Sequence, residues 1–371
     1  MQQILDTFDI SSNNGFLPHE PVKFLTHKSF KDWESVMADL PNINKNHNIR
    51  KRIMQLDEFD LTLLNANEPW HYRRAYVILA LLTNSYIFNE TPYPEIIPKK
   101  LAVPLTYVSK HLGIAPILTH ASVDLYNWAL INPNGKIELD NLKSVNLMTG
   151  TDDEQWFYLI MVAIEKVGGN VIKNILDIHL NRDNQHAIKS ALTLFANNLE
   201  EINKILARMR ERCNPSVFFN VLRFYLKGSK KNDNLPNGII YEGVSENYLQ
   251  YYGGSAAESS LFQVIDCAFG IVHEDVYFKE VQEYMPAKHR EFIHWVEKNI
   301  NIPNIVMPFN NDELNSKCSE IINKLKLFRS RHLSLVRDYI IKNIPVEPNS
   351  NTSNTIKEEK PIDDNDEIIL D

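Results

Sequence analysis

One histidine stands in the middle of an apolar stripe near the end of the chain. The stripe recurs at spacings of four and three residues, which places it on one face of a helix. Its members are Ile321, Leu325, Phe328, His332, Leu335 and Tyr339. Such a histidine is either a core residue bonded to a carbonyl group or a ligand that faces an apolar cavity, as a haem-iron ligand does. In the second case Arg329, one turn earlier, would meet an acidic group such as a haem propionate.

Arg223 is the second residue with unusual surroundings. It lies in the apolar sequence PSVFFNVLRFYLKG, with Phe219 and Leu226 on its own helix face. A guanidinium group keeps its charge and needs an anionic partner in such a place. The partner is either a structural carboxylate or the carboxylate of a substrate, which the planar fork of arginine binds through two hydrogen bonds.

A glycine turn, Gly253-Gly254-Ser255, leads into a further predicted helix over residues 256–272. The start of a helix can bind an anion, and a serine there can equally cap the helix, so the turn alone decides nothing. The common phosphate-loop, dinucleotide, zinc-protease and nucleophile-elbow motifs are absent from the sequence. Three widely spaced cysteines exclude a disulfide framework and a cysteine zinc site.

Composition excludes several classes of protein. The chain has 371 residues, of which 44% are hydrophobic and 23% charged, as in a globular protein with a sizeable core. The net charge is −8, and eight acidic residues and two lysines in residues 346–371 account for −6 of it. The first 345 residues are therefore close to neutral, whereas a nucleic-acid-binding surface needs clustered basic residues.

The apolar runs, such as residues 75–82, are far shorter than the about 20 residues of a membrane span. The N-terminus has neither the basic nor the apolar region of a secretory signal. We therefore expect a cytoplasmic, monomeric protein with no nucleic-acid or membrane partner.

The hydrophobic periodicity predicts an all-α fold with little strand. Residues 1–30 are predicted to be irregular, and helices are expected from Trp33 onward. The principal ones cover residues 72–88, 121–130, 157–167, 187–212, 214–228 and about 312–343. A polar, turn-rich stretch, residues 136–150, is the best domain boundary. It divides the chain into a small N-terminal domain (1–145), a large domain (146–345) and an acidic, disordered tail (346–371).

Five segments, in the same order along the chain, resemble the indoleamine 2,3-dioxygenase family of haem enzymes. They are LAVPLTYVSKHLGIAPIL (101–118), FFNVLRFYLKG (218–228), YEG…GGSAAESSLFQ (241–263), YMPAKHREF (284–292) and LFRSRHLSLVRDYI (327–340). The resemblance extends from about residue 50 to 345. It implies a two-domain, all-α protein in which the small domain caps a large domain that binds haem b, active in the ferrous form.

The resemblance also implies roles for individual residues. His332 would be the proximal iron ligand, and Arg329 would lie near a haem propionate with Asp266 as its acidic associate. Arg223 would hold the carboxylate of the substrate. The other substrate-side residues would be Phe218 against the indole, Phe157 in the distal pocket, and the turn Gly254-Ser255-Ala256 over the distal face.

Three features depart from the mammalian members of this family. Met161 stands where they carry a distal serine, and His120 stands where they carry a tyrosine. Their glycine- and threonine-rich loop after the proximal helix has no counterpart here, which bears on the affinity for tryptophan. His120 is interpreted as a residue of the pocket wall, with a second haem-side ligand and a distal hydrogen-bond donor as alternatives.

The implied reaction inserts both atoms of O2 across the indole C2–C3 bond of tryptophan and gives N-formylkynurenine, a step of tryptophan catabolism through the kynurenine pathway. Its partners would be the indole substrate, O2 and an electron donor that reduces the haem. No protein general acid or base is required, in agreement with the lack of a paired carboxylate motif. The alternatives are a related enzyme for another indole derivative, a myoglobin-like oxygen binder, and a helical scaffold in which His332 and Arg223 are structural.

Overall fold

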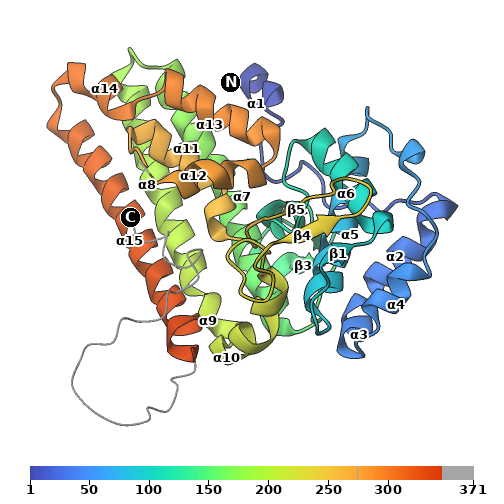
Figure 1. The fold of residues 1–371 in the computed structure, drawn as a ribbon. Coiled ribbons are helices and arrows are strands. Elements are labelled where there is room, and N and C mark those ends of the chain that lie inside the picture. The colour runs from blue at the N-terminus through green and yellow to red at the C-terminus, as the bar shows by residue number, and fades with distance from the viewer. Residues whose placement is uncertain (274, 345–371) are drawn as a thin grey trace, which may run out of the picture.

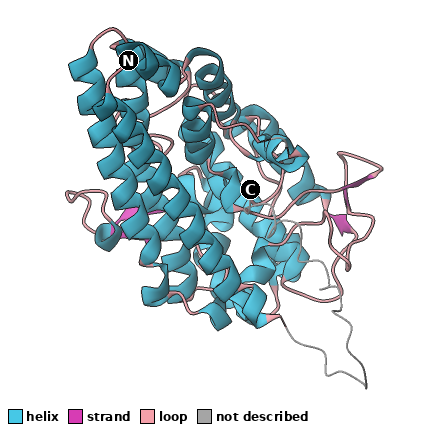
Figure 2. Ribbon diagram, turned by 90° about the vertical axis from the view of Figure 1, so that its left-hand side faces the viewer, coloured by secondary structure: helices cyan, strands magenta, loops and turns pink. Residues whose placement is uncertain are grey.

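The computed structural model describes residues 1–273 and 275–344, and it is mostly helical (Figures 1 and 2). The predicted all-α class is thereby confirmed. The predicted acidic tail, residues 346–371, lies outside the described residues. Within the described ranges no helix has the length and apolar character needed to cross a membrane.

The α-helices of the N-terminal half are α1 (Gln2–Thr7), α2 (Lys31–Ala38), α3 (Leu40–Lys45), α4 (Ile49–Met54), α5 (Pro69–Phe88), α6 (Lys99–Leu112) and α7 (Asp152–Leu180). Those that follow are α8 (Gln185–Ala207), α9 (Met209–Arg212), α10 (Pro215–Val217), α11 (Ser260–Phe269), α12 (Val276–Val281), α13 (Ala287–Asn299), α14 (Ile302–Val306) and α15 (Asp312–Tyr339). The prediction of an irregular N-terminus was wrong for α1. This helix is too short to show a period, and the buried side chain of Leu5 anchors it to the core.

Short strands form two small sheets. In the first, β1 (Ile96–Ile97) pairs in parallel with β4 (Ile239–Tyr241), which pairs antiparallel with β5 (Tyr248–Leu249). In the second, β2 (Trp128–Leu130) pairs antiparallel with β3 (Leu142–Ser144). These strands are only two or three residues long, so they add local pairing to a helical protein.

The predicted helix over residues 121–130 was half wrong. Only Ala121–Leu125 is helical, as the π-turn η3, and residues 128–130 form β2. Asn127 explains the change, because its side chain donates to the carbonyl of Asn146 (2.8 Å) and accepts from the amide of Asn146 (2.9 Å). These two bonds fix the chain in the extended pairing with β3, a contact that local periodicity cannot show.

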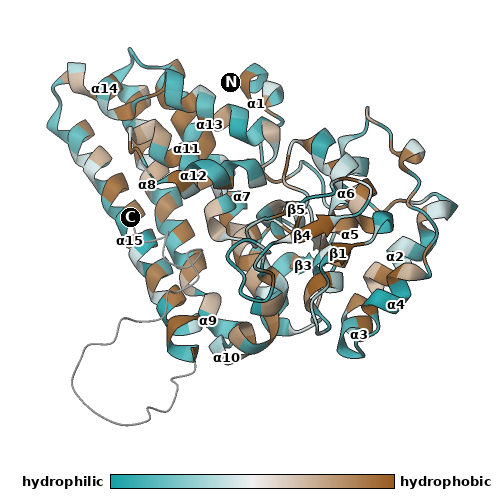
Figure 3. Ribbon diagram, in the orientation of Figure 1, coloured by the Kyte–Doolittle hydropathy of each residue, from teal (hydrophilic) through white to brown (hydrophobic). Residues whose placement is uncertain are grey.

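Three long helices form the body that carries the site. α7 packs against α8, and α8 packs against α15, which lies beside it in Figure 1. Figure 3 shows that α8 and α15 carry both hydrophobic and hydrophilic surfaces, whereas residues 158–164 of α7 are buried throughout. The predicted helix over residues 157–167 is confirmed as part of α7, and most of its residues are buried.

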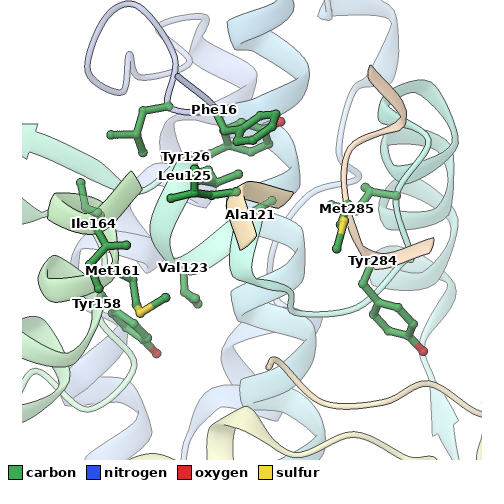
Figure 4. Packing of buried hydrophobic residues seen from close by; sticks show 14 of the residues in the cluster. Phe16, Ala121, Val123, Leu125, Tyr126, Tyr158, Met161, Ile164, Tyr284 and Met285 are labelled. Atoms are coloured by element: carbon green, nitrogen blue, oxygen red, sulfur yellow. The ribbon is translucent and has the colours of Figure 1, made fainter. Parts of the chain in front are cut away.

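The N-terminal helices join this body through η3. Helix α5, buried over most of its length, packs on α6 and on η3, and η3 also packs on α7. Figure 4 shows Tyr158, Met161 and Ile164 of α7 beside Val123 and Leu125 of η3. The division into domains at residue 145 stays a prediction.

Candidate active site

Helix α15 carries the predicted histidine. The side chain of Asn311 caps the helix by accepting from the amides of Glu313 and Leu314. The apolar members of the predicted stripe are all buried, in keeping with one helix face packed on the core. His332 lies in the same stripe but is only partly buried, because it faces two cavities.

The two cavities adjoin at His332. Their volumes are about 980 Å³ and about 750 Å³, including the space open to solvent at their mouths. Four residues border both cavities: Met161, Leu206, Ala256 and His332. Hence one imidazole borders two neighbouring spaces.

The imidazole of His332 is neutral and has no hydrogen-bond partner. Burial lowers the pKa of His332 to about 4, so the ring is uncharged at neutral pH. Its Nδ1 atom is buried and has no hydrogen-bond partner within the described part of the chain, so we expect Nε2 to be the ring nitrogen that faces the cavities. This geometry disfavours a core histidine bonded to a carbonyl group, and a neutral ring nitrogen is the form that binds a metal.

The second cavity has a charged edge. Nη2 of Arg329 donates to both carboxylate oxygens of Asp266, at 2.7 Å each. Nε2 of His273 lies 2.9 Å from Oδ2 of the same carboxylate, and its ring stacks on Phe278. The structure therefore brings Arg329 and Asp266 together as expected, and adds His273 as a residue that the sequence did not indicate.

Arg223 reaches the first cavity through a change of helix type. The predicted continuous helix over residues 214–228 is instead α10, the π-turn η5 (Phe218–Leu222) and the 3₁₀ turn η6 (Arg223–Leu226). The amide of Arg223 donates to the carbonyl of Phe218, five residues back, as in a π-turn. Residues five apart would lie about 140° apart around an α-helix, but one π-turn brings them to the same side. Both Phe218 and Arg223 consequently line the first cavity.

Aromatic rings form much of the wall near Arg223. The ring centroids of Phe157 and Phe218 are 5.0 Å apart, and those of Phe218 and Tyr339 are 5.6 Å apart. Arg223 itself lies 5.4 Å above the ring of Phe219. The first cavity thus offers flat apolar surfaces with a guanidinium group at one side, which suits an aromatic molecule that carries an acid.

The glycine turn completes the walls. A Cβ atom on Gly253 would collide with the backbone oxygen of Leu226, and one on Gly228 would collide with that of Tyr251. Glycine is therefore required at both positions for the two backbones to approach, and the approach brings the turn beside the segment of Arg223. Ser255 caps the following turn, η7 (Ala256–Glu258), because its side chain accepts from the amide of Ala257. Ser255 thus acts as a cap, but the predicted helix over residues 256–272 was wrong in its extent, because a 3₁₀ turn comes first and α11 covers only Ser260–Phe269.

His120 does not line either cavity. Its Nδ1 lies 2.7 Å from Oδ2 of Asp124, and its Nε2 lies 3.2 Å from Oε1 of Glu165. Both ring nitrogens are thereby occupied inside the protein, away from the walls of the cavities. The other predicted residues fall on the first cavity (Phe157, Met161, Phe218, Arg223, Gly254, Ser255, Ala256 and His332) or on the second (Asp266 and Arg329).

The sequence as a whole matches one family of enzymes. The family model for indoleamine 2,3-dioxygenase covers residues 4–367. Indoleamine 2,3-dioxygenase 1 of Rattus norvegicus is 33% identical over 352 residues, 92% of this chain and 86% of the relative. The indoleamine 2,3-dioxygenase of Saccharomyces cerevisiae is 32% identical over 388 residues, 98% and 85% of the two chains.

The chain belongs to the indoleamine 2,3-dioxygenase family. It is accordingly an oxidoreductase of the dioxygenase type, in a family of haem-dependent enzymes. A further relative, the 6-hydroxytryptophan 2,3-dioxygenase fscD of Fusarium equiseti, is 32% identical over 349 residues, 91% of this chain and 85% of the relative.

The residues around His332 fit the haem on which the indoleamine dioxygenase family depends. A neutral nitrogen without a partner is the donor that an axial position requires. In the second cavity the rings of Phe262 and Phe328 are stacked with centroids 4.2 Å apart, a flat apolar surface. Arg329 at the edge of the same cavity is a partner for acidic groups.

Several cavity residues were not predicted. Leu206 of α8 borders both cavities, and Met209 and Lys227 line the first. Leu206 belongs to an ordinary amphipathic face, so its position follows only from the packing of α8 on α15. Lys227 lies one turn after Arg223 in a quoted segment, and this spacing was the signal that could have indicated it.

Proposed function

We propose that this protein is a haem-dependent dioxygenase that cleaves the indole C2–C3 bond of tryptophan with both atoms of O2 and yields N-formylkynurenine. The observation that carries the proposal is the neutral, partnerless imidazole of His332, which meets two cavities, one of which also holds Arg223. In this proposal His332 would hold the haem iron as the proximal ligand, and Arg329, paired with Asp266, would meet a haem propionate. When bound, haem supplies the redox chemistry that activates O2.

On the substrate side, the protein itself contributes an apolar cavity that excludes water. Phe157, Phe218 and Met161 line the first cavity with apolar atoms. Such walls exclude water, and exclusion of water protects reduced iron from oxidation and strengthens the remaining polar contacts. None of these residues transfers a proton in the proposed reaction.

Arg223 would orient the substrate. Its guanidinium group lines the cavity whose other walls are aromatic, and a carboxylate bound there would fix one end of an amino acid. Fixing that end limits the positions of the indole ring relative to Phe218 and Phe157. Positioning of this kind can contribute several kcal/mol, on the order of 7–11 for well-oriented reactants, to lowering a barrier.

A substituted tryptophan is the second candidate substrate. The Fusarium equiseti relative, named for 6-hydroxytryptophan, is as similar to this chain as the yeast indoleamine 2,3-dioxygenase is. Family membership at this level of identity therefore does not distinguish between an indole and a hydroxyindole ring. Met161 is a bulky residue that borders both cavities. In our proposal its size determines which of the two rings the first cavity accepts.

The test is a spectrum followed by turnover. The purified full-length chain is titrated with haemin, and a Soret band that saturates at one haem per chain is expected. The reduced protein is then mixed with air and either tryptophan or 6-hydroxytryptophan, and formylkynurenine products are measured by mass spectrometry. A missing Soret band would refute the haem assignment, whereas a stable oxygenated spectrum without product would identify an oxygen binder.

A further inference from the structure

A group of buried charged side chains lies directly behind the cavities. His120 pairs with Asp124 of η3 and with Glu165 of α7, and Glu258 of η7 completes the group. These four residues and Ser259 are between 1 and 4% exposed. The proposed reaction uses none of these four ionisable residues, and burying charged groups costs free energy unless they are paired.

This group holds the segment of residues 253–259, which we call the shared wall because it borders both cavities. Gly254, Ser255 and Ala256 line the first cavity, and Ala256, Ala257 and Ser259 line the second. The shared wall contains only one short 3₁₀ turn, η7, so its own backbone bonds do little to fix its position.

Two glutamates, Glu258 within the shared wall and Glu165 of α7, attach this segment to its surroundings. Oε1 of Glu258 accepts from the amide of Ser255 (3.1 Å), and its Oε2 accepts from the amide of His120 (2.6 Å). Next to Glu258, the hydroxyl of Ser259 donates to Oε1 of Glu165 (2.6 Å). The imidazole of His120 also pairs with Oε1 of Glu165. The attachment through Glu258 and the attachment through Glu165 therefore both lead to His120.

The charges in this group keep it assembled. Burial by itself lowers the pKa of His120, but Asp124 and Glu165 outweigh it and raise the pKa to about 10. The imidazolium is thus retained at neutral pH and balances the neighbouring carboxylates. Glu165 is central, since its single oxygen Oε1 receives both the wall hydroxyl and the imidazolium.

We propose that Glu165 is a positioning residue of this enzyme: together with His120 it fixes the shared wall through Ser259 and thereby sets substrate affinity, although it lines neither cavity. Glu165 lies one helical turn after Met161, which borders both cavities, so α7 supports the site directly and through the wall. The expected change in substrate affinity rests on the proposed function. The expected loosening of the shared wall can be measured in the haem-free protein.

The first experiment measures hydrogen exchange in the haem-free protein. We expect Glu165→Gln to increase the exchange rate of amides in residues 253–259 at least tenfold, with α8 unchanged. The matched control is Glu154→Gln, because Glu154 is also a fully buried glutamate of α7 and accepts from Met148, Thr149 and Gly150 at the far end from the shared wall. Unchanged exchange in Glu165→Gln, or an equal increase in Glu154→Gln, would overturn the proposal.

A pair of adjacent serines gives the second comparison. Ser259 donates to Glu165, whereas the hydroxyl of the equally buried Ser260 has no hydrogen-bond partner. Ser259→Ala is expected to increase exchange in the shared wall, Ser259→Thr to restore it, and Ser260→Ala to leave it unchanged. A response of Ser260→Ala equal to that of Ser259→Ala would mean that packing, and not the bond to Glu165, fixes the wall.

The third experiment uses the haem-loaded enzyme. We expect Glu165→Gln to raise the KM for tryptophan at least fivefold while kcat and haem content change less than twofold. If the wild-type protein makes no product, the proposed dioxygenase function is refuted. The hydrogen-exchange data then still test whether Glu165 fixes the shared wall. If product forms and KM is unchanged in Glu165→Gln, the positioning role in substrate binding fails and the dioxygenase function stands.

Discussion

Two histidines of this protein stand in opposite electrostatic surroundings. Burial alone lowers the pKa of His332 to about 4, and its Nδ1 has no partner among the residues that the structure describes. His120 is more deeply buried, yet the carboxylates of Asp124 and Glu165 raise its pKa to about 10 and occupy both ring nitrogens. The first ring is a neutral donor open to the cavities, and the second is a fixed cation inside the fold.

Helix α7 connects the two surroundings. Met161 lines both cavities next to His332, and Glu165, one turn later, pairs with His120. A cavity that must stay apolar and a charged group that fixes its wall are therefore separated by a single helical turn. Pairing of the charges behind the wall therefore matters for the site, because an unpaired carboxylate so close would change the electrostatic field in the cavity.

Removal of the neutral histidine should give the largest effect. We expect His332→Ala to bind haem at least tenfold more weakly and to purify with little or no haem, because the axial nitrogen is lost. The ratio of Soret to protein absorbance measures this directly. The matched control is His179→Ala, since His179 is also partly buried on a long helix, with a buried Nδ1 that has no partner. Full haem loading of His332→Ala would assign the axial position to another residue.

Removal of the charged histidine should damage the fold itself. His120→Ala leaves Asp124 and Glu165 buried without their cation, and we expect the free energy of unfolding to fall by about 3–5 kcal/mol. His332→Ala in the haem-free protein should cost about 1 kcal/mol, as for a typical substitution. Urea denaturation of both variants without haem measures the difference. Equal losses of unfolding free energy in the two variants would mean that His120 does not neutralise buried carboxylates as its surroundings indicate.

Substitution of Arg223 tests the role of the first cavity, in contrast to the buried group around His120. Its charge lies on the wall of the first cavity, so its loss should affect the substrate more than the fold. We expect Arg223→Ala to raise the KM for tryptophan about a hundredfold, since a charge-assisted bond to a carboxylate is worth about 1.5–3 kcal/mol or more when bidentate. The haem spectrum should not change. Steady-state kinetics and the Soret band check both expectations, and unchanged kinetics would remove the carboxylate role.

Local pattern was sufficient for some parts of this structure. The stripe around His332 follows from the helical period alone. Asn214 is of a residue type typical of helix N-caps, and its side chain accepts from the amide of Ser216. These features depend on neighbours within one or two turns. The family segments extended the prediction to the second cavity, where Arg329 and Asp266 form the expected pair.

The predictions that were wrong concern residues whose positions depend on contacts far along the chain. His120 was expected in a pocket wall, but its position depends on partners 45 and 138 residues away. The strand β2 depends on Asn127 bonding to Asn146, and the π-turn at Phe218–Leu222 depends on packing that no local propensity encodes. A single sequence contains the residue types for such contacts but not the distances between them.

The smallest expected effect is a dependence of stability on pH that originates in the charged group. Burial raises the pKa of Glu258 from 4.5 to about 8, so the folded protein binds this proton more tightly than the unfolded chain. The resulting stabilisation is complete below pH 4.5 and is lost as the pH rises through 8. For His120 the corresponding loss occurs between pH 6.5 and 10. We expect the melting temperature to fall by several degrees from pH 6 to pH 10, measured by calorimetry (about 2–4 °C per kcal/mol).

Glu258→Gln separates these two contributions. Glutamine at this position does not titrate, so the slope of melting temperature against pH should become smaller between pH 5 and 8. The slope between pH 8 and 10 should persist, because the imidazolium of His120 still loses its proton there. An identical slope in the variant below pH 8 would mean that Glu258 is already ionised in the folded protein. The two amides that it accepts, from Ser255 and His120, would then outweigh its burial, and the charged group behind the wall would carry one more negative charge than proposed.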